Sequence, residues 1–322
     1  MKTKILIFGL IAGFFVLTNS CTDEFLKEDA RTGNNEKVYL TANGLTGLMN
    51  SCYTYTRVWY GKEAALGLAE AGTDLWLAGR DNKQKNMVEY ASITPVTGTD
   101  LCFEEYWEIL FTAVNACNTV IKYCDLNTDL SDATLKQYKG EAQFLRAFYY
   151  WHLVETWGPV PIYKVPTETS TSDVSRDNEA DVYDFMLQDV NNAIINLDDK
   201  ITKNGRVNKW AAKALKARLL LYLASEYNGG NYGKVQAYTD AAATAQEVID
   251  ESGASFYTNY ADCWLQATED GKTNDEAIWY VEYSQNISEN VLPLRSDGSK
   301  LRQVIVRASS GNATTQGGNA LH

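Results

Sequence analysis

The stretch GEAQFLRAFYYWHLVETWGPVPIY, residues 140–163, decides how this 322-residue chain folds. Large apolar side chains occupy every side of its helical wheel, and a helix that is apolar all round is buried all round. Each such side chain contributes roughly 1.5 to 3 kcal/mol when it is buried. The stretch therefore predicts a helix inside a core, carried by Phe144, Leu145, Ala147, Phe148, Tyr149, Tyr150, Trp151, Leu153, Val154 and Trp157.

His152 lies in the middle of this aromatic run and raises the question of catalysis. The chain has 2 histidines, and the other one is its last residue. A general base needs an orienting carboxylate, and Glu155 is the one carboxylate three or four residues away on the same helix. The sequence contains no nucleophile elbow, HExxH motif or histidine pair. We therefore expect His152 to be a buried polar residue of the core rather than a catalytic group.

Helical periodicity continues on both sides of this stretch. The central helix is predicted to begin after Ser131, a good N-cap, and to end at Gly158 and Pro159. Asn208 is the predicted N-cap of another helix. Further helices are expected within residues 39–59, 103–124, 182–199, 209–227 and 234–252, with one possible strand at residues 302–308. The fold class is mostly α, and successive helix hairpins suggest tetratricopeptide-like stacking.

The first residues form an export signal. Residues 1–20 consist of a positive MKTK, a 13-residue apolar run and a polar TNS. The apolar run is too short to span a membrane, but the pattern is typical of a signal peptide, so these residues are excluded from the fold. Cys21 follows at the position that is acylated in bacterial lipoproteins. Ordinary signal cleavage with a free Cys21 is the alternative. Residues 21–37 are acidic and polar and are predicted to be a tether.

Composition excludes several classes of function. The formal net charge is −12, which repels nucleic acids and anionic membrane surfaces. The cysteines after Cys21 are odd in number and contain no C-x-x-C pair, so neither a disulfide framework nor a zinc site is expected. Cys117 and Cys124 lie on one helix face and are predicted to be small buried hydrophobes. No cofactor is predicted.

Residues 125–136, DLNTDLSDATLK, offer one weak metal motif. Oxygen-bearing side chains stand at the first, third and fifth positions of an EF-hand loop. Leu130 replaces the required glycine, however, and Lys136 replaces the closing glutamate. A turn that ends in a helix cap explains the same residues, so the sequence predicts no metal site here.

The central stretch GEAQFLRAFYYWHLVETWGPVPI resembles the hallmark helix and turn of SusD/RagB-type lipoproteins, the nutrient-binding outer-membrane proteins of Bacteroidetes. Four more segments agree in order, namely CTDEFL, YWEILFTAVNACNTVI, RVNKWAAKALKARLLLYLA and NDEAIWYVEYSQN. Members of this family are usually longer, so we expect residues 38–322 to be the N-terminal part of a SusD-like helical domain whose C-terminal remainder is missing.

The resemblance implies a helical fold of tetratricopeptide-like hairpins whose irregular loops hold the ligand. It also implies a surface lipoprotein on the outer membrane, with Asp23 and Glu24 after the acylated cysteine as an export signal. Such proteins capture an oligosaccharide or a peptide without cleaving it and pass it to a SusC-like TonB-dependent transporter. We therefore expect a non-catalytic glycan-binding protein. A peptide-binding or protein-binding adaptor on the same scaffold is the main alternative, and a glycoside hydrolase is a weaker one.

Sugar recognition needs flat aromatic faces together with polar side chains that bond hydroxyl groups. The loop AEAGTDLWLAGRDNKQKN best meets this need. Its predicted ligand contacts are Trp76, Arg80, Asp81 and Asn82, although Trp76 packed inside and an Arg80–Asp81 surface pair would explain the same residues. A second, weaker cluster is Arg57, Trp59 and Tyr60. Three aromatic residues further along, Trp279, Tyr280 and Tyr283, are expected to belong to the scaffold.

Overall fold

The computed structural model describes residues 36–57, 68, 76–77, 101–167, 174–202, 204–264, 275–281 and 320–321. Contacts divide the chain into two units, Met1–Val38 and Tyr39–His322. In the first unit the structure describes residues 36–38, which belong to the 3₁₀ helix η1 (Glu36–Leu40). The second unit contains the helices described below.

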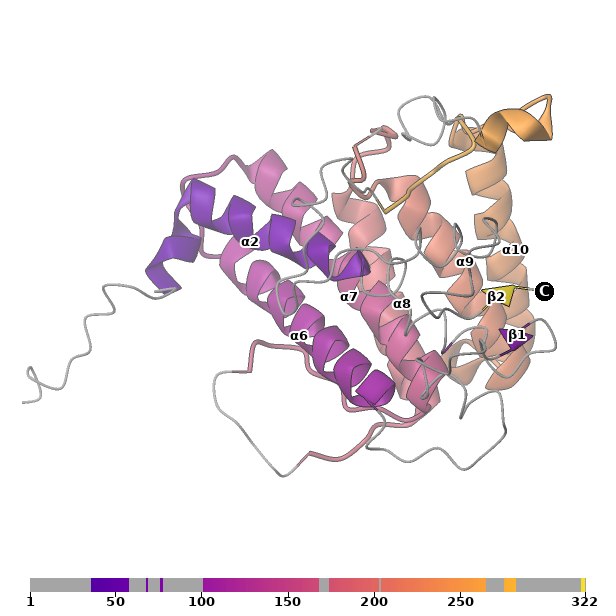
Figure 1. The fold of residues 1–322 in the computed structure, drawn as a ribbon, viewed down its shortest axis with the longest axis horizontal. Coiled ribbons are helices and arrows are strands. Elements are labelled where there is room, and N and C mark those ends of the chain that lie inside the picture. Colours follow the sequence, from indigo (N-terminus) through magenta and orange to yellow (C-terminus); the bar gives the residue numbers. More distant parts are fainter. Residues whose placement is uncertain are drawn as a thin grey trace, which may run out of the picture. The chain divides into compact units, whose positions relative to one another are not determined.

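The described part of the second unit is mostly helical, as predicted. From α6 onward, each helix packs against the next one along the chain, and α2 packs against α6 (Figure 1). The α-helices are α2 (Ala42–Thr54), α6 (Leu101–Cys124), α7 (Asp132–Trp157), α8 (Glu179–Asn196), α9 (Lys209–Glu226) and α10 (Lys234–Glu251). Two short 3₁₀ helices, η2 (Gly230–Tyr232) and η3 (Tyr260–Trp264), flank α10. Strands β1 (Trp76–Leu77) and β2 (Ala320–Leu321) pair antiparallel.

The ends of these helices follow from local side-chain chemistry. The Ser131 hydroxyl accepts a hydrogen bond of 3.2 Å from the Thr134 N–H at the start of α7. The Asn208 side chain accepts bonds from two N–H groups at the start of α9. Each cap satisfies backbone donors that the helix itself leaves unpaired. Gly158 ends α7 with a φ of 67°, a conformation that glycine adopts without strain. The predicted boundaries of α7 are confirmed.

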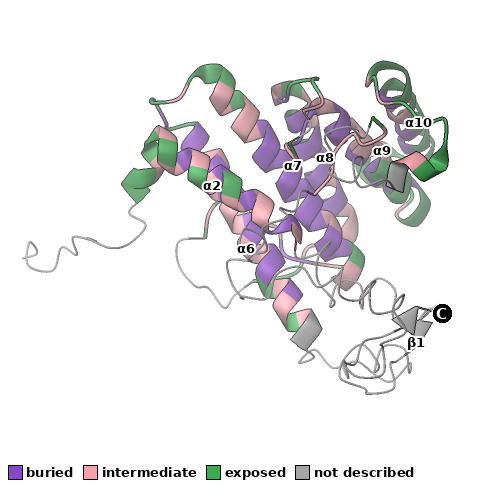
Figure 2. Ribbon diagram, turned by 45° about the horizontal axis from the view of Figure 1, so that its top comes forward, coloured by how far each residue is buried: buried purple, intermediate pink, exposed green. Residues whose placement is uncertain are grey.

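The middle of α7 is buried, which confirms it as the core helix (Figure 2). The side chain of His152 is 3% exposed and packs edge-on against the Phe148 ring, with 4.7 Å between ring centroids. The prediction of burial all round is wrong at Trp151, which is half-buried, and at the C-terminal end of the helix, where Trp157 is half-buried and Glu155 is exposed. The Glu155 carboxylate accepts a hydrogen bond from the Tyr183 hydroxyl of α8.

A buried ion pair joins α7 to α8. The Arg146 guanidinium donates two parallel hydrogen bonds, of 2.7 and 2.6 Å, to the Asp189 carboxylate. A third bond, of 2.6 Å, reaches the side-chain oxygen of Asn118 on α6, whose amide nitrogen donates to the carbonyls of Tyr163 and Val165. This network therefore fixes the chain that follows α7 to three helices at once.

Residues 125–136 form the turn and helix cap that explain their composition. The Asp125 carboxylate accepts a 2.7 Å bond from the Lys139 ammonium group. The Asn127 side-chain oxygen accepts bonds from the backbone N–H groups of Asp129 and Leu130. These contacts use the side-chain oxygens at the first and third positions of the EF-hand motif.

Two further observations concern membrane spans and cysteines. Within the part of the chain that is described, none of the helices combines the length and apolarity that crossing a membrane requires. Cys117 and Cys124 are buried free thiols in the core, as predicted.

Candidate functional site

A pocket lined by both polar and aromatic residues lies where the end of α2 meets two chain segments from elsewhere in the sequence, residues 204–206 and 279–281. Its volume is about 210 Å³. We call it the arginine pocket. The lining side chains that matter below are Asn50, Tyr53, Arg57, Asn204, Arg206, Trp279 and Tyr280.

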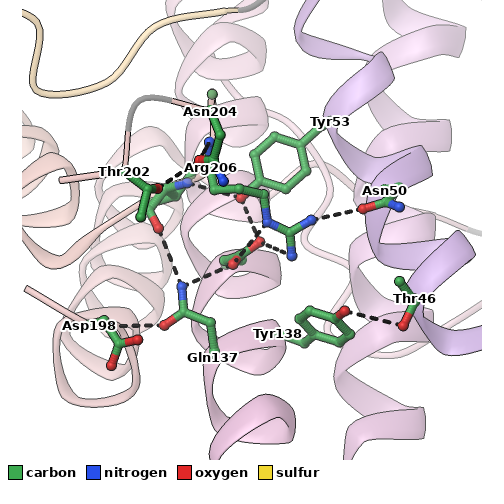
Figure 3. Close-up of polar contacts among 12 residues, drawn as sticks. Thr46, Asn50, Tyr53, Gln137, Tyr138, Asp198, Thr202, Asn204 and Arg206 are labelled. Atoms are coloured by element: carbon green, nitrogen blue, oxygen red, sulfur yellow. Dashed lines mark hydrogen bonds and ion pairs between the residues drawn. The ribbon is translucent and has the colours of Figure 1, made fainter. Parts of the chain in front are cut away.

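Arg206 is held from several sides in the arginine pocket. Its guanidinium carbon lies 5.2 Å from the centroid of the Tyr53 ring and 5.3 Å from that of the Tyr138 ring. Figure 3 shows Arg206 reaching toward α2, where its Nη1 donates a 2.8 Å bond to the Asn50 side chain. Its Nη2 lies 2.9 Å from the Glu141 carboxylate. Two aromatic faces and two acceptors therefore hold the cation in one place.

Glu141 is the buried acceptor that organises this side of the pocket. Its side chain is 1% exposed, and it accepts a 2.6 Å bond from the Tyr53 hydroxyl and a 2.9 Å bond from the Gln137 amide. Burial raises the pKa of the Glu141 carboxyl, while the charge of Arg206 and these hydrogen bonds act in the opposite direction. The Tyr53 hydroxyl in turn accepts the Val207 N–H at 3.1 Å. Glu141 therefore positions residues on α2 and on the chain before α9.

The opposite side of the pocket is a tight turn before α9. The Asn204 side-chain oxygen accepts bonds from the Thr202 hydroxyl and the Arg206 N–H. Gly205 has a φ of 71°, in the region that favours glycine, and its carbonyl accepts a 2.9 Å bond from the Trp279 indole. The Trp279 ring also packs edge-on against Phe144 of the core, with 5.1 Å between centroids. The turn and the indole thus hold each other in place.

The chemistry of the arginine pocket suits a ligand rich in hydroxyl groups. Arg57 brings a guanidinium to the lining. The side-chain oxygens of Asn50 and Asn204 are already engaged, whereas their amide nitrogens donate no hydrogen bond within the described residues. Amide and guanidinium donors beside the rings of Trp279 and Tyr280 are the groups that bond sugar hydroxyls and pack against pyranose faces.

The predicted site residues fall in different places. Arg57 lines the arginine pocket, and Trp279 joins the scaffold as expected while also lining the pocket. Trp76 lies in β1, where its backbone pairs with Leu321. The roles predicted for Trp76 and for the rest of its loop stay predictions. The predicted residues outside the described part of the chain are Cys21, Trp59, Tyr60, Arg80, Asp81, Asn82, Tyr283 and the strand at 302–308.

Five residues of the arginine pocket and its support were not predicted from the sequence, namely Asn50, Tyr53, Glu141, Asn204 and Arg206. One signal was available, because Glu141 is a carboxylate at the start of the stretch 140–163 that was predicted to be buried all round. A buried carboxylate requires a cationic or hydrogen-bonding partner. Nothing in the sequence indicated which of the 29 lysines and arginines would supply it.

Comparison with known proteins gives one consistent family. Residues 70–221 match the profile of a SusD-like family described as starch-binding and associating with the outer membrane. A SusD-like protein of Bacteroides ovatus is 26% identical over 301 residues, covering 91% of this chain and 52% of that protein. The starch-binding protein SusD of Bacteroides thetaiotaomicron is 26% identical over 182 residues, covering 56% of this chain and 29% of that protein.

A solved structure of a SusD-like protein is also similar to this chain. A laminarin-binding SusD-like protein is 25% identical and superposes with a TM-score of 0.63, over 74% of this chain and 50% of that one. The chain thus spans about half the length of the Bacteroides ovatus relative and of this laminarin-binding protein.

Proposed function

Because this chain is a SusD-like protein, we propose that it binds neutral oligosaccharides at the surface of the outer membrane and passes them, uncleaved, to a SusC-like TonB-dependent transporter. The arginine pocket is the observation that carries the proposal. It combines the Arg57 guanidinium, the amides of Asn50 and Asn204 and the ring of Trp279 on a scaffold fixed by Glu141. Two similar proteins are described as starch-binding and laminarin-binding, which supports neutral oligosaccharides as the ligand class.

The proposed ligand contacts lie in two groups. The first is the arginine pocket. The second is the loop residues Trp76, Arg80, Asp81 and Asn82, whose ring, guanidinium, carboxylate and amide are again the side chains that sugars require.

The pocket contacts can be tested by calorimetric titration of malto- and laminari-oligosaccharides into the purified 322-residue chain. A hydrogen bond from a charged group contributes about 1.5 to 3 kcal/mol, so we expect Arg57→Ala to weaken binding roughly tenfold or more. Asn204→Ala should also weaken it, by a smaller factor. Arg218→Ala is the matched control, because this exposed arginine of α9 lies over the Trp151 ring and not in the pocket. Its affinity should equal that of the wild type.

Three results would contradict the proposal in different ways. Equal affinities for the wild type and Arg57→Ala would remove the arginine pocket from the binding site. Binding of peptides but of no glycan would favour an adaptor on the same scaffold. Release of shorter sugars during the titration, detected by chromatography, would show that the protein cleaves its ligand.

Anchoring is a separate part of the proposal. We infer that residues 1–20 are removed as a signal, that Cys21 is then acylated, and that residues 21–37 tether the SusD-like domain of residues 38–322. In a bacterial host that makes lipoproteins, the wild type should partition into the detergent phase and take up labelled palmitate, whereas Cys21→Ala should do neither. Cys263→Ala is the control, because Cys263 lies far from the signal in sequence. Labelling of the Cys21→Ala variant would contradict acylation at this position.

A further inference from the structure

A second hollow, separate in its lining from the arginine pocket, lies between α6 and the chain that follows α7. Its volume is about 440 Å³. We call it the aromatic groove. We propose that it binds one sugar unit of a neutral glycan, as a second glycan contact on the same chain; this inference rests on the proposed function for its ligand class. The groove is lined by Trp107, Glu108, Phe111, Thr112, Val114, Asn115, Pro161, Tyr163 and Thr167.

The α6 wall of the groove has two parallel stripes. Trp107, Phe111 and Val114 are spaced by four and three residues, which places them on one face of the helix. Each is followed directly by a polar residue that also lines the groove, so a polar stripe runs beside the apolar one. A pyranose has an apolar face and a rim of hydroxyl groups, and the two stripes match these two parts.

The aromatic rings of the groove lie at steep angles to one another. The rings of Phe111 and Tyr163 are perpendicular, with an interplanar angle of 90° and 5.7 Å between centroids. The Trp107 ring lies 4.7 Å from Phe111 and is tilted by 56°. All three side chains are half-buried, so part of each ring faces the groove. A flat sugar ring can pack on one aromatic face while its edge contacts the next.

The wall opposite α6 is fixed before any ligand arrives. The Tyr163 N–H donates a 2.7 Å bond to the hydroxyl of Tyr150, and the Tyr163 carbonyl accepts one of 3.0 Å from Asn118. At the end of this segment the Thr167 N–H donates a 2.8 Å bond to the side-chain oxygen of Asn115. Because binding does not have to order this chain segment, less conformational entropy is lost on binding.

The polar stripe offers hydrogen bonds that the folded chain does not use. The Asn115 oxygen is engaged, but its amide nitrogen donates no bond within the described residues. The exposed Glu108 carboxylate makes no ion pair in the same part of the chain, and a carboxylate accepts bonds from two neighbouring hydroxyls. The Glu108 carboxylate and the net charge of −12 oppose a sulfated or uronic acid glycan. Arg176, whose guanidinium carbon lies 5.8 Å from the Trp107 ring centroid, is a cation near the groove, and with Glu108 it leaves charges of both signs there. These features favour a neutral sugar.

Calorimetry with maltoheptaose and laminarihexaose on the 322-residue chain tests the groove. The groove variant is Glu108→Ala combined with Phe111→Leu, which removes the carboxylate and the flat ring but keeps an apolar side chain. Asn115→Asp is the second variant, because it keeps the oxygen that accepts from Thr167 and loses the donor. The matched control is Glu104→Ala, an exposed glutamate one turn earlier on α6 that does not line the groove.

We expect the wild type to bind two molecules of the preferred oligosaccharide. The groove variant should lose one binding event or weaken it at least tenfold, while the other changes by less than twofold, and Asn115→Asp should weaken the same event. Arg57→Ala should give the reverse pattern, and Glu104→Ala should match the wild type. Thermal unfolding of each variant separates lost binding from lost folding.

The outcomes distinguish this inference from the proposed function. A single binding event that Arg57→Ala weakens and the groove variants do not would overturn the groove and leave the arginine pocket standing. A single event that only the groove variants weaken would support the groove and refute the pocket. Binding of a proline-rich peptide, with no sugar bound in the groove, would replace the sugar by a peptide there. Failure of the wild type to bind any neutral glycan would overturn both.

Discussion

Replacing Asp189 by alanine is expected to lower the free energy of unfolding by about 3 to 5 kcal/mol, the cost of leaving one charge of a buried ion pair without its partner. The side chains of Arg146 and Asp189 are 7% and 3% exposed, so water cannot replace the lost carboxylate. The Arg146 guanidinium would keep its bonds to Asn118 and to the Lys164 carbonyl, neither of which carries the opposite charge. Urea denaturation followed by far-ultraviolet circular dichroism measures the change.

Two controls separate the charge effect from lost packing. Asp250→Ala removes an exposed aspartate of α10 that accepts a bond from Gln246, and should change stability by about 0.5 kcal/mol or less. Replacing both partners, as Arg146→Met with Asp189→Leu, leaves no buried charge and should recover much of the loss. A loss of less than about 1 kcal/mol for Asp189→Ala would show that the pair does not hold α7 to α8 as the geometry indicates.

The second large effect is an acid sensitivity caused by His152. Burial, aided by the charge of Arg218, lowers the pKa of its imidazole from 6.5 to about 3. Below pH 6.5 the His152 imidazole therefore binds a proton in the unfolded chain but stays neutral in the folded chain. The contribution of neutral His152 is fully present above that pH and is lost as the pH falls toward 3. Between pH 8 and pH 5 the loss is about 2 kcal/mol.

His152→Gln isolates this contribution, because glutamine is polar, uncharged and of similar size. The unfolding free energy of the wild type should fall between pH 8 and pH 5 by about 2 kcal/mol more than that of the variant. Both proteins share every other titrating group, so the difference between the two pH profiles belongs to His152. Parallel profiles would show that the imidazole titrates normally. Glycan affinity at pH 7 should be nearly unchanged, since His152 lines neither the arginine pocket nor the aromatic groove.

Much of the fold was predictable from residues 140–163 and the segments on either side of them, because local rules decide most of it. The N-caps Ser131 and Asn208, the stop at Gly158 and the burial of His152 each follow from chemistry within a few residues. The exposure of Glu155 does not, since it depends on where α8 ends up relative to α7.

The candidate sites were less predictable, because they are assembled from distant segments. Arg206 meets Glu141 across 65 residues and Asn50 across 156. In the aromatic groove, Asn115 meets Thr167 across 52 residues. Composition and spacing identify residues suited to sugar, such as Arg57, but periodicity within one helix does not tell which segments a fold brings together. That information lies in the packing of helices against one another.

The arginine pocket and the aromatic groove are both supported by side chains of α7. Glu141 on α7 sets the arginine pocket through Arg206, and Arg146 on the same helix steadies the groove wall through Asn118. Five residues separate them, which in an α-helix is an advance of about 7.5 Å and a rotation of about 140°. The helix thus fixes the distance and the angle between the side chains that support the two sites. New loops grafted onto this scaffold should change the ligand that each site binds. Substitutions that repack α7 should instead disturb the arginine pocket and the aromatic groove together.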